Sequence, residues 1–299
     1  MLRSALFGSR RYFSSASGVK TIGIIGGGQM GNGIAQVSSQ QAGLNVILVD
    51  KNQEQLDKGM KFMNKLLQKN VEKGKITEEV KQQTVDRIQT STDLGSLESA
   101  DFVVEAVSEN LELKNSLFRD LSKITRPEVI LATNTSSISI TKIAAATDRP
   151  ENVIGMHFMN PVPIMKLVEI IPGLATSNET LETTLELAKN MGKTTAQSND
   201  QPGFIANRLL MPYINEAVFA LQENLGTRDD IDTTMKLGCN MPMGPLTLAD
   251  FIGLDTCLAI MEVLHTQLGD SKYRPSPLLI KYVDAGWLGK KTGRGFYEY

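Results

Sequence analysis

The sequence is poor in the residues from which metal centres and disulfide frameworks are built. Its 299 residues include two cysteines and two histidines, which excludes a disulfide framework, a four-cysteine zinc site and a histidine-rich metal site. Charge is nearly balanced, with 31 basic and 33 acidic residues, so no excess of positive charge indicates nucleic acid or anionic lipid. No apolar run approaches the roughly 20 residues of a membrane span. The composition therefore predicts a globular protein of one or two domains, without a metal, a nucleic-acid partner or membrane insertion.

Acidic residues are missing from the N-terminal segment as well. Residues 1–17 contain three arginines and five serines, and the first acidic residue of the chain is Asp50. This composition is typical of a mitochondrial transit peptide and predicts a location in the mitochondrial matrix. The apolar stretch at 5–7 is too short for a secretory signal. The alternative is an N-terminal extension without a targeting role.

After residue 18 the sequence alternates between short β-branched runs and helical patterns. Buried strands are predicted at 19–25, 45–50, 102–107, 129–133, 153–158 and 166–171, with helices at 30–42 and 54–73 among the segments between them. This alternation predicts a mostly parallel, doubly wound sheet covered on both faces. From residue 204 onward only helical patterns remain, at 205–222, 229–237, 246–268 and 276–285. We therefore predict an α/β Rossmann-like domain over 18–201 and an all-α domain over 202–299.

A glycine-rich turn follows the first predicted strand. It runs Gly26, Gly27, Gly28, Gln29, Met30, Gly31. In a G-x-G-x-x-G turn the first glycine permits the tight turn, the second lets the backbone approach a pyrophosphate, and the third lets the helix lie close to the sheet. Asp50 ends the next strand, where a carboxylate accepts hydrogen bonds from ribose hydroxyls and repels a 2′-phosphate. The pattern predicts NAD rather than NADP; the alternative is a glycine turn in an α/β protein that binds no dinucleotide.

Polar side chains gather where three further strands end. Ser136 follows the strand at 129–133, His157 lies in the strand at 153–158, and Glu169 lies in the next strand. A histidine near a nicotinamide suggests a general acid or base, and a carboxylate within reach would orient its ring. Ser136 and Asn160 are candidates to hydrogen-bond a substrate oxygen. The alternative is a structural histidine, which is our reading of His265.

Six ordered blocks of the sequence resemble one enzyme family. They are GGGQMGNGIAQ at 26–36, ATNTSSISIT at 132–141, GMHFMNPVPIMKLVEI at 155–170, PGFIANRLL at 202–210, GPLTLADFIGLDT at 244–256 and GKKTGRGFYEY at 289–299. The chain resembles, over residues 18–299, the short-chain L-3-hydroxyacyl-CoA dehydrogenases in their single-function mitochondrial and bacterial form. The resemblance implies NAD as cofactor, an acyl-CoA thioester as substrate, and a homodimer formed by the helical half.

The resemblance also implies roles for individual residues. His157 matches the family's catalytic histidine and Glu169 the carboxylate paired with it. The matches on the substrate side are Ser136, Asn160, Asn207 and Lys73, the last where a long helix approaches CoA phosphates. The matches on the cofactor side are Asp50, Glu109, Lys114, Asn134 and Lys291.

Other functions remain open at this point. A relative that oxidises a free hydroxy acid or sugar acid shares the glycine turn and the histidine block, as would an NAD-binding protein without catalysis. The 3-hydroxyisobutyrate dehydrogenase class uses a catalytic lysine, and the HFMNP block at 157–161 does not fit it. Neither the preferred acyl length nor the direction of flux follows from the sequence.

Overall fold

The computed structural model describes residues 18–299. The transit-peptide prediction over 1–17 lies outside the described residues. Among the described helices, none combines the length and the apolar character needed to cross a membrane.

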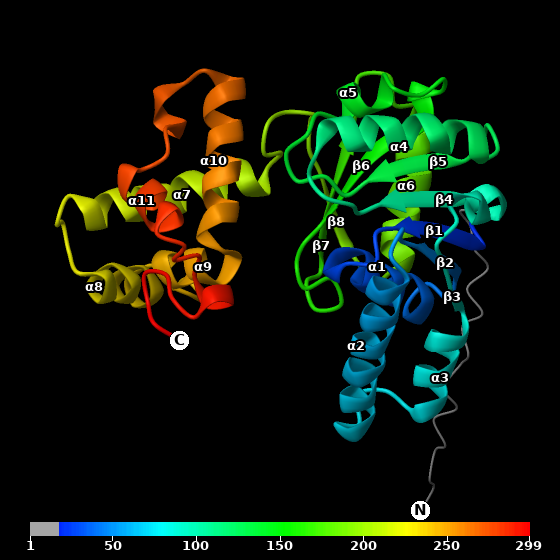
Figure 1. Cartoon of the computed structure of the whole chain (residues 1–299), viewed down its shortest axis with the longest axis horizontal. Helices are drawn as coiled ribbons and strands as arrows, with labels where there is room; N and C mark the ends of the chain where they lie inside the picture. The colour runs from blue at the N-terminus through cyan, green and yellow to red at the C-terminus, as the bar shows by residue number, and fades with distance from the viewer. Residues whose placement is uncertain (1–17) are drawn as a thin grey trace, which may run out of the picture.

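The first half of the chain is built on one eight-stranded sheet (Figure 1). The strand order is β3-β2-β1-β4-β5-β6-β7-β8, and all neighbours are parallel except β6 and β7. The order reverses direction between β1 and β4, which is where a doubly wound sheet opens a ligand crevice. The strands are β1 Thr21–Ile25, β2 Asn45–Val49, β3 Ile88–Ser91, β4 Phe102–Glu105, β5 Ile130–Thr133, β6 Val153–Phe158, β7 Leu167–Pro172 and β8 Thr194–Gln197.

Helices cover both faces of this sheet, because its central strands are apolar on both sides. Alternate residues of one strand enter different cores: Val46 and Leu48 of β2 pack in one, Ile47 and Val49 in the other. The first core also holds residues of α1 Gln29–Gln40, α2 Gln53–Glu72, α3 Glu78–Asp86 and α6 Asn178–Asn190. The second holds residues of α4 Leu111–Ile124 and α5 Ile140–Ala144. Two buried faces explain the near-continuous apolar runs read in the sequence.

The second half of the chain is helical and lies to one side of the sheet (Figure 1). Its helices enclose a third core of their own. They are α7 Ala206–Gln222, α8 Arg228–Thr233, α9 Pro245–Ile252, α10 Leu254–Leu268 and α11 Pro277–Asp284. The predicted fold class, a Rossmann-like doubly wound part followed by an all-α part, is confirmed.

Several details of the prediction were wrong. The segment 246–268 is not one helix, because Gly253 with φ 105° ends α9 and a new helix starts at the next residue. The edge strands β3 (IQTS) and β8 (TTAQ) were not predicted, and neither was α3. Edge strands need few apolar residues, so polar segments of this kind carry a weak hydrophobic pattern.

The segment that joins the two halves of the chain is anchored in the core of the sheet domain. Gly203 and Phe204 both have positive φ, 78° and 48°. Phe204 is buried in the second core of the sheet domain, and its ring packs beside His157 of β6. A positive φ in a phenylalanine is strained backbone that persists only where its surroundings hold it. The start of α7 is therefore held in place relative to the ends of the strands.

Candidate active site

His157 and Glu169 form a buried pair across two antiparallel strands. They are register partners of β6 and β7, and His157 Nδ1 lies 2.8 Å from Glu169 Oε2. Both residues are buried, and the Phe204 ring packs beside the imidazole with centroids 5.8 Å apart. A carboxylate can only accept, so Nδ1 carries the proton and Nε2 is left with a free lone pair. This is the tautomer that a general base requires.

The other oxygen of Glu169 accepts hydrogen bonds from the first amides of α7. Ile205 and Ala206 donate their backbone N–H groups to Oε1 at 3.0 and 2.9 Å. Burial alone would raise the pKa of the Glu169 carboxyl, but the hydrogen bond from His157, these amides and the nearby imidazole outweigh burial, so the pKa is lowered. Glu169 is therefore ionised at neutral pH and faces the imidazole as an anion.

A second carboxylate organises the turn that carries Ser136. Glu109 Oε1 accepts hydrogen bonds from the Thr135 hydroxyl at 2.6 Å and from the Ser136 amide and hydroxyl at 2.8 and 3.1 Å. Burial would raise the pKa of Glu109, but the charge of Lys114 and these hydrogen bonds together lower it. The Ser136 hydroxyl is therefore oriented by a fixed negative charge.

Two asparagines connect this turn to its neighbours. Asn207, in the first turn of α7, donates from Nδ2 to the Ser136 carbonyl at 3.2 Å. Asn134 accepts from the Phe158 amide at 2.9 Å and so ties the end of β5 to the end of β6. Asn160 is exposed on the loop after β6. The structure thus brings Ser136 and Asn207 together next to the histidine strand.

The glycine turn has the shape that the sequence predicts. Gly26 has φ 109°, and a Cβ there would lie 2.5 Å from the Ala106 carbonyl oxygen. At Gly31 a Cβ would lie 1.8 Å from the Gly26 oxygen, so only glycine allows α1 to sit this close. A Cβ on Gly28 would meet nothing within 4 Å, so open space faces the N-terminus of α1. No side chain caps this helix, which leaves its first amides available to an anion.

A cavity of about 470 Å³ lies beside this turn, at the point where the strand order reverses. Gly26, Gly28 and Asp50 line it, with apolar contacts from Val49 and Leu117. Asp50 Oδ2 accepts the Gly27 amide at 2.7 Å. Because a carboxylate offers about four acceptor positions, Asp50 keeps room for ribose hydroxyls. The cavity fits the adenosine half of a dinucleotide.

A second cavity, of about 580 Å³, lies on the α2 side of the same turn. Its wall combines apolar side chains such as Phe62 and Val162 with Asn160 and Lys58. Gln29 lines this cavity rather than the first one, and Met30 packs into the core of the sheet domain. Residues of the glycine turn line both cavities, and residues 160–164 of the loop after β6 line the second.

Comparison with known proteins identifies the family. The model of the 3-hydroxyacyl-CoA dehydrogenase NAD-binding domain matches residues 21–201, and that of the C-terminal domain of the same enzymes matches residues 203–299. The chain belongs to the 3-hydroxyacyl-CoA dehydrogenase family.

Relatives within this family cover nearly the whole chain. A probable 3-hydroxybutyryl-CoA dehydrogenase of Bacillus subtilis is 57% identical over 94% of this chain and 98% of its own length. The human mitochondrial hydroxyacyl-coenzyme A dehydrogenase is 45% identical over 94% and 91%. The crystal structure of (S)-3-hydroxybutyryl-CoA dehydrogenase from Ralstonia eutropha matches with a TM-score of 0.91 at 49% identity, covering 94% of this chain and 99% of that one.

The family's cofactor is NAD, and the residues present fit it. The uncapped helix N-terminus, the open space at Gly28 and the carboxylate of Asp50 supply a phosphate site and a ribose site in one crevice. Within residues 18–299 no group of three or more His, Cys, Asp or Glu side chains is placed to hold a metal ion.

Among the residues predicted from the resemblance, Asp50 and Asn160 line the two cavities. The others do not, namely His157, Glu169, Ser136, Asn207, Glu109, Asn134, Lys114, Lys291 and Lys73. Lys114 is buried, and its Nζ binds Glu105 at 2.6 Å and approaches Glu109 at 3.6 Å. Lys291 is on the helical domain, where its Nζ pairs with Asp255 of α10. Lys73 ends α2 as an exposed side chain. The structure does not bring Lys114 or Lys291 to the wall of the dinucleotide crevice.

Sequence reasoning missed Glu105. This fully buried carboxylate accepts from Lys114 Nζ, from the Thr133 hydroxyl at 2.7 Å and from the Val107 amide at 2.6 Å. It therefore joins β4, β5 and α4 beneath the turn that carries Ser136. An acid within the apolar run FVVEAV at 102–107 was the available signal, because a buried charge must be paired.

Replacing Glu169 with Gln tests whether its charge holds the junction. We expect the free energy of unfolding, measured with urea at pH 7, to fall by about 1–3 kcal/mol because charge-assisted hydrogen bonds are lost. A carboxyl whose pKa is lowered stabilises the fold fully above its ordinary value of 4.5 and less as pH falls through the lowered pKa. The gap between wild type and variant should therefore shrink below about pH 4.5.

Glu182→Gln, at an exposed position of α6, is the matched control and should change stability by less than about 0.5 kcal/mol. A gap for Glu169→Gln that stays constant from pH 7 to pH 3 would contradict a charge-based role.

Proposed function

We propose that the protein oxidises L-3-hydroxyacyl-CoA thioesters to 3-ketoacyl-CoA with NAD, reversibly, with His157 as the general base and acid. The reaction is of the fatty-acid β-oxidation type. The observation that carries the proposal is the 2.8 Å contact between His157 Nδ1 and an ionised Glu169, because it leaves Nε2 free to take a proton. The pair lies next to the N-terminus of α7, whose first amides donate to Glu169.

In the oxidative direction His157 Nε2 removes the proton of the 3-hydroxyl group as the C3–H bond breaks. When bound, NAD supplies the acceptor for the hydride that leaves C3. In the reverse direction the imidazolium returns its proton to the 3-carbonyl oxygen. Glu169 stabilises that imidazolium, and such acid–base catalysis contributes roughly 10²–10⁴-fold to the rate.

We assign three further side chains, those of Ser136, Asn207 and Asn160, to the substrate side of the site. The Ser136 hydroxyl is oriented by Glu109, and Asn207 holds the Ser136 backbone. Asn160 borders the second cavity, which suits a thioester arm because its volume is about 580 Å³ and its wall is largely apolar. Lys58 on its wall and Lys73 at the end of α2 offer positive charge to the phosphates of CoA.

We also propose that the boundary between two domains with different roles lies at residue 201. Residues 18–201 would hold the cofactor, and residues 202–299 would complete the substrate site and form the dimer contact. The two family models support it, since one ends at 201 and the other begins at 203.

The activity is tested first with His157→Gln. NADH consumption with acetoacetyl-CoA should fall by roughly 10²–10⁴-fold, while NADH affinity stays within about twofold. His265→Gln, which changes the exposed histidine of α10, is the matched control and should keep full activity. Free acetoacetate serves as the alternative substrate. Turnover of acetoacetate instead of the thioester would favour a hydroxy-acid dehydrogenase, and a collapse of NADH binding in His157→Gln would make the histidine structural.

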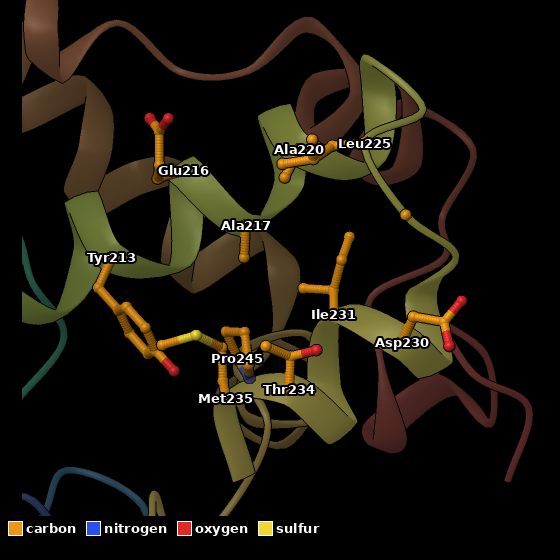
Figure 2. A pocket seen from close by; sticks show the side chains of 11 residues that line it. Tyr213, Glu216, Ala217, Ala220, Leu225, Asp230, Ile231, Thr234, Met235 and Pro245 are labelled. Carbon is orange, nitrogen blue, oxygen red and sulfur yellow. The ribbon is translucent and has the colours of Figure 1, made fainter. Parts of the chain in front are cut away.

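A homodimer is the expected assembly, and an apolar groove on the helical domain supports it. The groove has about 410 Å³ and is lined by Ala217 of α7, Ile231 of α8, Met235 of the helical turn after α8, and Pro245 at the start of α9 (Figure 2). Leu225 at its end is 82% exposed. An apolar groove bordered by an exposed leucine is typical of a protein–protein contact. We propose that a second copy of the chain covers it.

Leu225→Asp tests this assembly. Leu225 is exposed in the single chain, so the variant should fold, while a charge buried between two copies should shift the mass in solution from dimer towards monomer. Leu174→Asp, on a residue of the sheet domain that is 90% exposed, is the control and should leave the mass unchanged. Light scattering gives the mass. A monomeric wild type would refute the dimer, and a dimeric Leu225→Asp would place the contact elsewhere.

We propose in addition that residues 1–17 direct the protein to the mitochondrial matrix. The arginine- and serine-rich, acid-free composition supports this. Residues 1–17 fused to a fluorescent protein should carry it into mitochondria, and changing Arg3, Arg10 and Arg11 to Gln should abolish import. A fusion that stays in the cytosol with the arginines intact would refute the assignment.

A further inference from the structure

The peptide between Gly27 and Gly28 joins two residues that have no side chain to restrain them. Glycine populates positive and negative φ about equally, so this peptide could turn over at little cost if nothing held it. Its orientation matters, because the Gly28 amide begins the row of free N–H groups at the N-terminus of α1. Among the described residues, no backbone hydrogen bond is donated by that amide.

Two side chains from different helices hold the carbonyl of this peptide. Asn32 Nδ2 of α1 and Gln55 Nε2 of α2 both donate to the Gly27 oxygen, the latter at 3.0 Å. Asn32 Nδ2 also reaches the Gly28 oxygen at 3.0 Å. In a trans peptide the C=O and N–H bonds point in opposite directions. Fixing the Gly27 oxygen towards α2 therefore fixes the Gly28 N–H away from α2.

The contacts of Asn32 settle which way its amide faces. If the amide were reversed, its oxygen would face the carbonyl oxygens of Gly27 and Gly28, which cannot donate. The nitrogen therefore lies on the side of these two carbonyls. The residue is 6% exposed, and its Oδ1 has no hydrogen-bond partner in the part of the chain described. Leaving a buried acceptor unpaired is unfavourable. Gly59 of α2 leaves room for this amide, since a Cβ there would come within 2.1 Å of Nδ2.

We infer that Asn32 and Gln55 are positioning residues for the cofactor. By holding the Gly27 carbonyl from two sides, they keep the Gly28 amide directed at the pyrophosphate before the dinucleotide arrives. A donor that is already oriented in the free protein strengthens binding, because the peptide loses no conformational entropy when the ligand associates. This inference rests on the proposed NAD-dependent function. Since Gln55 lines both cavities, the same side chain separates the cofactor from the second cavity.

Gln55→Met is the sharpest test, because the side chain is half-buried and methionine keeps its length without a donor. Loss of one neutral hydrogen bond should weaken NADH binding by about 3- to 10-fold in a fluorescence titration. The KM for NADH should rise similarly, with kcat unchanged. ADP, used as a competitor of NADH, should lose affinity as NADH does, while adenosine should not, because it lacks the pyrophosphate.

Gln53→Met is the matched control, since Gln53 starts the same helix and donates only to Asp57. It should bind NADH like the wild type. Asn32→Ala, read alongside its circular dichroism, should weaken NADH at least as much as Gln55→Met. Equal NADH affinity in Gln55→Met and wild type, or equal loss for adenosine and ADP, would overturn the inference. A wild type that does not bind NADH would overturn the proposed function itself.

Discussion

The carboxylate of Glu169 is the constraint on which the rest of the site depends. One of its oxygens accepts a hydrogen bond from the imidazole of His157, and the other accepts hydrogen bonds from the first amides of α7. The imidazole of the sheet domain and the first amides of the helical domain are therefore bound to the same carboxylate. Its position follows from strand register, because His157 and Glu169 face each other across the antiparallel pair. A change that moves either strand or the helix moves the pair.

Around this anion the site is assembled from strand ends and helix N-termini, where unpaired backbone donors occur. Glu109 gathers the amides and hydroxyls of the turn after β5, and Glu105 neutralises Lys114 beneath it. The glycine turn presents its free amides at the start of α1. Three carboxylates thus order the protein scaffold, while the helix N-terminus of α1 is left for an external anion.

The fold class and the central pair could be predicted from the sequence because their signals are local. Buried strands read as apolar runs, the glycine spacing is fixed by steric contacts such as that at Gly31, and His157 and Glu169 stand on adjacent strands. Contacts set by tertiary packing could not be predicted. The burial of Lys114 depends on Glu105, and the break at Gly253 depends on a backbone angle that a helical pattern does not reveal.

The antiparallel hairpin of β6 and β7 has a consequence for how such a protein can diversify. The position of the His157–Glu169 pair is set by the pairing of the strands, whereas residues 160–164 of the connecting loop form a wall of the second cavity. Insertions, deletions or exchanges in that loop leave strand pairing intact and reshape only the wall. Selection can therefore reshape the second cavity, which we propose holds the thioester arm, through one short loop that leaves the His157–Glu169 pair in place.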